Sequence, residues 1–142
     1  MELTRRELVN KARIAVLAIL TLSVINLCFM IFSNLVGMRA FPDYSPMVMT
    51  LFNVFLITLG LLSIWQLFTG IDGHAMRGKI LLLLAVEFFA VYVADIANIF
   101  PRSTEPMGQT PFAVEIFGAV LAVLLFVSAS WYIKAVNVPE SV

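Results

Sequence analysis

The stretch ILLLLAVEFFAVYVADIANIF, residues 80–100, decides how this chain folds. It is long and apolar enough to cross the hydrocarbon core of a bilayer as an α-helix, which takes about 20 residues at 1.5 Å per residue. It also contains two acids, Glu87 and Asp95. A charged side chain near the bilayer centre costs about 2.5–3.5 kcal/mol on insertion scales. Such acids therefore face a partner, a cavity or a pathway, or they carry a proton.

Three further apolar runs accompany this stretch. Residues 14–36 and 45–71 carry no charge, and residues 112–133 carry only Glu115. The apolar share of the chain is 61%, above the roughly 45–50% of soluble domains. Backbone groups in lipid must form hydrogen bonds within their own segment, so these runs are expected to be helices. The expected membrane spans are residues 14–36, 47–69, 79–100 and 111–133.

The connections between the runs are short and rich in proline and glycine. Short connections make consecutive helices antiparallel neighbours. The sequence therefore predicts an all-α integral membrane protein with a single membrane domain, folded as an antiparallel four-transmembrane-helix up-down bundle. Residues 1–13 are expected to form a basic segment on the membrane surface, and residues 134–142 a short cytoplasmic tail.

The distribution of basic residues predicts the orientation of this bundle. Seven of them lie in the N-terminal segment, the second connection and the C-terminal end, and two lie in the first and third connections. The positive-inside rule then places both termini inside, and we expect a bacterial inner (plasma) membrane. The net charge of zero gives no reason to expect nucleic-acid binding. The single cysteine, Cys28, excludes a disulfide within the chain and a paired-thiol redox centre.

In this topology every helix contributes a polar group at a similar, outer depth. The groups are Asn34, Asn53, Asp95 with Asn98, and Glu115. Tyr92, Asp95 and Asn98 follow one another at one-turn spacing and should form a polar stripe on the third helix. Arg39 and Arg102, from the outer connections, flank the layer as possible charge partners.

Glu87 differs from these residues in depth and in direction. It precedes Asp95 by eight residues, which places it about 12 Å deeper and roughly 80° away around the helix axis. None of the four runs offers a basic residue at that depth. Glu87 is therefore either a protonatable site or a contact with a partner subunit, or it is a neutral side chain that bonds to Asn26 or Thr58.

The fourth span carries Gly118 and Ala122, whose spacing lets two helix backbones approach closely. Packing of the third span on this face would bring Asp95 near Glu115. Two carboxylates in a medium of low dielectric cannot both remain ionised unless a proton or a cation lies between them. The sequence then predicts a proton-sharing pair or a site for a hard cation, with Asn53 or Asn98 adding neutral oxygens. In the alternative, Asp95 and Glu115 pair with the arginines and only fasten the outer end of the bundle.

Three functions are compatible with these features. The first is a proton- or cation-linked transporter or channel subunit that works as an oligomer, because four helices are few for enclosing a path. The second is a non-catalytic subunit or assembly factor of a larger membrane complex. The third is a lipid- or quinone-handling membrane enzyme, although no catalytic residue set is recognisable. No cofactor or metal site is predicted. The expected partners are the lipid bilayer and either further copies of the chain or other membrane subunits.

Overall fold

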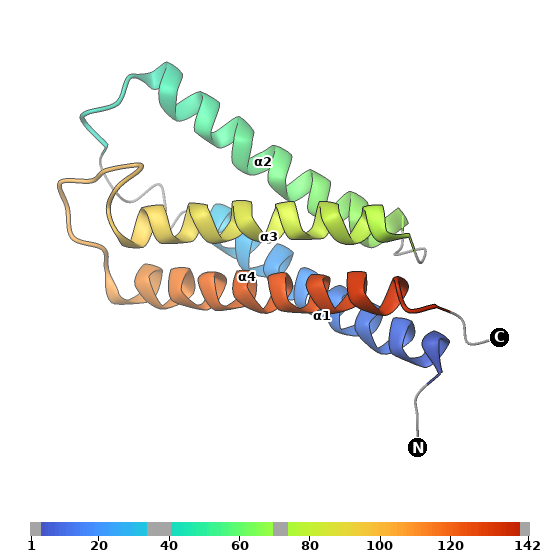
Figure 1. Cartoon of the computed structure of the whole chain (residues 1–142). Helices are drawn as coiled ribbons and strands as arrows, with labels where there is room; N and C mark the ends of the chain where they lie inside the picture. Colours follow the sequence, from blue (N-terminus) through green and yellow to red (C-terminus); the bar gives the residue numbers. More distant parts are fainter. Residues whose placement is uncertain (1–3, 34–40, 70–73, 140–142) are drawn as a thin grey trace.

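The structure is a computed structural model that describes residues 4–33, 41–69 and 74–139. Within these ranges the chain forms four α-helices and no strand (Figure 1). The helices are α1 (Arg5–Phe32), α2 (Pro46–Thr69), α3 (Ala75–Ile96) and α4 (Gln109–Val136). The predicted all-helical class is therefore confirmed.

Three of these helices, α1, α2 and α4, are long and apolar enough to cross a membrane, as judged by length and composition. α3 is not among the three, although it corresponds to the third expected span. It is 22 residues long and contains Arg77, Lys79, Glu87 and Asp95. The charges of α1 all lie within its first nine residues, whereas those of α3 are spread along the helix and include two acids in its apolar part.

The basic N-terminal segment continues directly into the first apolar helix. α1 begins at Arg5, and Thr4 caps it. The Glu7 N–H donates to Thr4 Oγ1 at 3.4 Å, and the Thr4 N–H donates to Glu7 Oε2 at 2.9 Å, which is the reciprocal arrangement of a capping box. The backbone N–H of Thr4, followed by its hydroxyl, holds the pKa of Glu7 below its ordinary value. The capping box therefore makes residues 5–13 part of one long helix.

Contacts between helix ends define how the helices run past one another. The start of α1 lies beside the end of α4, where Arg5 Nη2 donates to the Val136 carbonyl at 2.8 Å. Near the start of α3, Gly78 lies against Ile133 of α4, and near the end of α3, Tyr92 lies against Gly118. α3 and α4 share the largest contact, α1 packs mainly on α4, and α2 makes the smallest contacts (Figure 1).

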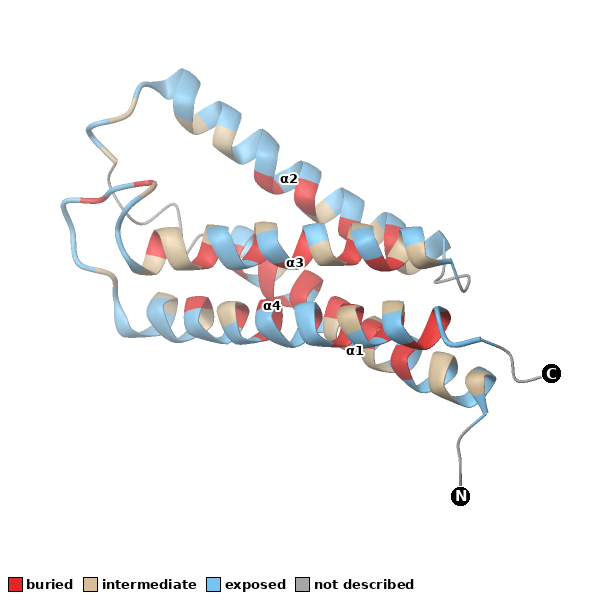
Figure 2. Cartoon of the chain, viewed as in Figure 1, coloured by how far each residue is buried: buried red, intermediate tan, exposed pale blue. Residues whose placement is uncertain are grey.

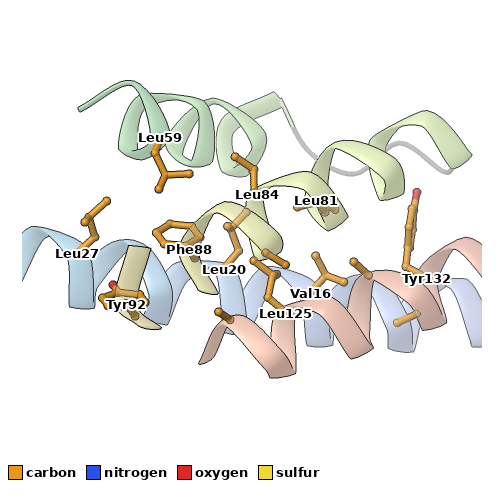
Figure 3. Packing of buried hydrophobic residues seen from close by; sticks show 14 of the residues in the cluster. Val16, Leu20, Leu27, Leu59, Leu81, Leu84, Phe88, Tyr92, Leu125 and Tyr132 are labelled. Carbon is orange, nitrogen blue, oxygen red and sulfur yellow. The ribbon is translucent and has the colours of Figure 1, made fainter. Parts of the chain in front are cut away.

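The core lies between α1, α3 and α4. Figure 3 shows Leu20 of α1, Leu84 and Phe88 of α3, and Leu125 of α4 pointing toward one another. Each of these four side chains is almost fully buried. In lipid the expulsion of water does not drive helices together, so the stability of such a core depends on close packing.

α2 lies at the edge of this three-helix core. Most of its surface is exposed (Figure 2), and its buried residues are Leu56, Leu59, Ser63 and Gln66. The end of α2 that contains Gln66 is attached to α3, because Arg77 Nη1 donates to Gln66 Oε1 at 3.3 Å. Its other end leans away from α3 (Figure 1). α2 is thus held near one end and diverges from α3 toward the other.

The connection between α3 and α4 begins with a turn at Asn98. α3 ends at Ile96, four residues before the end of the span expected at 79–100, because Asn98 has a positive φ of 51°. The Asn98 side chain holds the turn in two places: Nδ2 donates to the Ser103 carbonyl at 3.0 Å, and Oδ1 accepts from the Ser103 N–H at 2.8 Å. Asparagine suits this position because it tolerates the left-handed region better than most residues.

Asn98→Ala is expected to lower the free energy of unfolding by about 1–3 kcal/mol, because it removes two hydrogen bonds and leaves a residue that disfavours positive φ. Asn98→Gly loses the same bonds but fits the backbone, so it should cost less than Asn98→Ala. Thermal unfolding in detergent measures both values. Equal stability of Asn98→Ala and the wild type would show that this turn does not support the fold.

Candidate functional site

The candidate site is formed where the end of α3 meets the start of α4. α3 contributes Tyr92 and Asp95, which are one turn apart, and α4 contributes Glu115. Asp95 is 8% exposed and Glu115 is 2% exposed. Buried carboxyl groups are rare unless they have a partner, and both make interactions within the chain. The two acids are therefore built into the bundle and do not reach out from its surface.

Asp95 and Glu115 line the same small cavity, which has a volume of about 30 Å³. Its other walls are mostly apolar: Leu27, Met30, Ile31, Phe52, Leu56, Val91, Tyr92 and Pro101. A water molecule requires roughly 10–15 Å³ of such space, so the cavity has room for at least one small polar guest. Among the described residues, no lysine or arginine lines it. The chemistry available inside the cavity is consequently that of two carboxyl groups and one phenol.

Tyr92 joins three helices at this point. Asn26 of α1 donates from Nδ2 to Tyr92 Oη at 3.1 Å and to the Val114 carbonyl of α4 at 3.4 Å. The Tyr92 ring lies on Gly118 of α4 and is stacked with Phe88, with ring centroids 6.3 Å apart. Asn26 thus links α1 to both α3 and α4. It also fixes the phenol at the wall of the cavity.

Glu87 lies apart from this cavity, in a groove between α2 and α3. The groove has a volume of about 360 Å³ and is otherwise apolar, with walls of Phe52, Phe55, Val86, Ala90, Val91, Ala94 and Phe100. Glu87 is half-buried. Within the part of the chain that the structure describes, it forms no hydrogen bond or ion pair. The alternative partners expected for Glu87 are engaged elsewhere, since Thr58 donates to the Val54 carbonyl and Asn26 to Tyr92.

Three of the remaining predicted site residues, Asn53, Asn98 and Arg102, do not line the cavity. Asn53 is exposed on α2. Asn98 lies beyond the end of α3 and is committed to its turn. Arg102 is exposed, and its backbone N–H donates to Tyr44 Oη at 3.2 Å. Arg39 and Asn34, also named in the sequence prediction, lie outside the described residues.

Sequence reasoning missed one polar contact, between Gln66 and Arg77. Gln66 is 3% exposed, and it anchors α2 to α3 through the bond to Arg77. The signal was present in the sequence, because a glutamine inside an apolar run needs a partner as much as an asparagine does. This contact matters for the site because it determines which end of the α2–α3 groove is held together.

Comparison with known proteins places the chain in a family. Residues 11–141 match the family described as Domain of unknown function (DUF8051). The chain belongs to this family. No curated protein and no solved structure matches it. For this DUF8051 protein, the chemistry of the site must therefore be argued from its own residues.

Proposed function

We propose that this DUF8051 protein is a proton- or cation-linked transporter or channel subunit that works as an oligomer. In this proposal all four helices cross the membrane as an antiparallel up-down bundle with both termini inside a bacterial inner membrane. The apolar character of α1, α2 and α4 supports insertion. The seven basic residues on the expected inner side support the orientation.

One observation carries the functional part of the proposal: Asp95 and Glu115 come from two helices and line a single buried cavity. Two carboxyl groups that share a space of low dielectric can hold one proton between them or bind a cation, because a negative charge on one of them disfavours a negative charge on the other. The small volume of the cavity selects a proton, with or without one water, or a single dehydrated hard cation. The phenol of Tyr92 provides a neutral oxygen beside the pair.

The oligomer in this proposal is supported by the exposure of α2. A cavity of about 30 Å³ is too small to be a path through one chain. A path therefore needs either a movement of the helices or a surface shared with another copy. α2 presents a long exposed apolar face for such a contact, which includes Leu51, Val54, Leu61 and Phe68.

The same exposed face also suits the second candidate function, a non-catalytic subunit or assembly factor of a larger membrane complex. The two functions differ in what covers α2. Purification in mild detergent as a homogeneous homo-oligomer would favour the transporter. Stoichiometric association with a different membrane protein would favour the subunit role.

The test of the transporter proposal uses the purified chain in liposomes that contain a pH-sensitive dye or, in a parallel sample, a sodium-sensitive dye. With a potassium diffusion potential applied, the wild type should show proton or alkali-cation flux. Asp95→Asn and Glu115→Gln should each reduce that flux at least about ten-fold, because each removes one member of the pair. Glu105→Gln is the matched control, since Glu105 is an exposed acid in the connection after α3. Flux that is unchanged in both pair variants would contradict the proposal.

A further inference from the structure

The groove between α2 and α3 is a second site, separate from the paired carboxyl groups. It arises because α2 leans away from α3 beyond the Gln66–Arg77 contact (Figure 1). Its volume of about 360 Å³ lies within the range of pockets that hold drug-sized ligands, roughly 300–1,000 Å³. The groove therefore has room for a compact molecule that carries several apolar groups.

Aromatic rings close the groove at the diverging end. Phe100, which follows α3, packs edge-on against Phe52 of α2 with ring centroids 5.2 Å apart. Tyr44 packs edge-on against the same Phe100 ring at 5.1 Å. This bridge interrupts the groove before it runs the full length of the two helices. A bounded groove suits a compact ligand better than a transmembrane helix, which needs a continuous channel about 10 Å wide.

Of the described residues that form the groove walls, only Glu87 is charged. The described residues give its carboxyl group neither a hydrogen bond nor a salt bridge. A carboxylate in apolar surroundings is stabilised most by a cation that also donates a hydrogen bond. A second copy of the chain has no lysine or arginine within residues 80–133 except Arg102, and none within residues 14–36 or 47–69. Self-association therefore does not supply that cation at the depth of Glu87.

We propose that this groove binds a hydrophobic organic cation, an ammonium group on a compact apolar body. The ammonium pairs with the Glu87 carboxylate, and the apolar body packs against Phe52, Phe55 and Ala90. The ligand enters sideways from the lipid, since the groove is open along the side of the bundle. This inference names the substrate class of the proposed transporter. It rests on the proposed function in one respect only, namely that the cation bound in the groove is also the molecule transported across the membrane.

The test measures equilibrium binding of adamantan-1-amine to the purified full chain in detergent by titration calorimetry. Its neutral counterpart of the same shape, adamantan-1-ol, serves as the comparison ligand. The wild type should bind the amine at least about ten-fold more tightly than the alcohol, because only the amine forms a charge-assisted hydrogen bond to Glu87. Glu87→Gln should remove this preference, and the two ligands should then bind equally weakly.

Two further variants test the proposal independently, in case Glu87→Gln changes the fold. Ala90→Leu fills the groove and should weaken both the amine and the alcohol. Glu105→Gln alters an exposed acid outside the groove and should leave both affinities unchanged. The proposal is overturned if the amine binds Glu87→Gln as tightly as the wild type, or if Ala90→Leu has no effect on either ligand. A strong preference of Glu87 for a basic transmembrane peptide over the amine would also overturn it.

This binding experiment uses no proton gradient, and the flux experiment is first run without the amine. Amine binding, with no proton or cation flux even after the amine is added to the liposomes, would support the groove and reject the transporter. Flux that depends on Asp95 and Glu115, together with absent amine binding, would support the transporter and reject the ligand class. The two failures are therefore distinguishable.

Discussion

Gly118→Ala is expected to lower the free energy of unfolding by about 1–3 kcal/mol, the usual cost of overpacking a well-filled interior. A Cβ atom at position 118 would lie 2.6 Å from both Cε1 and Cε2 of Tyr92 and would also collide with Cζ. The ring has little freedom to move away, because its hydroxyl accepts from Asn26 and its face stacks on Phe88. Gly118→Leu should cost more than the alanine change.

Gly60→Ala is the matched control, because Gly60 also lies inside an apolar helix. Its added Cβ would meet only Leu27 Cδ2, at 3.4 Å. Alanine is the better helix former by about 1 kcal/mol, so Gly60→Ala should be neutral or slightly stabilising. Both variants are compared by denaturant unfolding in detergent, with Trp65 and Trp131 as fluorescent reporters. Equal stabilities for the two alanine variants would contradict the close approach of α3 to α4.

Phe88→Ala is expected to cost roughly 2–4 kcal/mol, which is somewhat less than the 3–5 kcal/mol typical of buried phenylalanine in water-soluble proteins. The expected cost of Phe88→Ala is lower because the unfolded chain is surrounded by lipid or detergent and not by water. In lipid or detergent the unfolded reference state keeps the ring out of water, so the cost comes mainly from the empty space left among Leu20, Leu84 and Leu125. Loss of the stacked Tyr92 contact adds to it.

Phe89→Ala removes the same side chain one position later and provides the control. Phe88 is 1% exposed and Phe89 is 44% exposed. Lipid can fill the space left at position 89, so Phe89→Ala should change the stability by no more than about 1 kcal/mol. A loss of stability at position 89 that matches the loss at position 88 would mean that α3 packs through a different face.

The apolar runs were sufficient to predict the four helices of the described residues. Glu87 and Asp95, which are about 80° apart around the helix axis, line two different spaces: a groove between α2 and α3, and a cavity to which all four helices contribute side chains. The small residue at position 118 indicated the face of α4 that α3 approaches. These features depend on the local geometry of one helix, so they can be predicted from the sequence of that helix alone.

Other features depended on distant residues and were not predictable in this way. Asn98 was expected in the polar stripe, but bonds to Ser103 end the helix before it. Asn53 was assigned to the outer polar layer by depth alone, and depth does not give the face of α2 that meets the bundle. The divergence of α2 from α3 follows from where Gln66 and Arg77 meet. The position of Gln66 in an apolar run indicates that it needs a partner, but nothing within α2 identifies Arg77 as that partner.

The dependence of α1 on α4 has a consequence for the timing of assembly. A ribosome makes the chain from its N-terminus, so α1 is complete long before its main partner exists. The hydrogen bond of Asn26 to Tyr92 joins residues 66 positions apart, and that of Arg5 to Val136 joins residues 131 positions apart. Contacts between such distant residues slow folding because a long segment has to be ordered before they form. The bundle can therefore form completely only when α4 has been synthesised. Until then the amide of Asn26 lacks its acceptor on α4, the Val114 carbonyl.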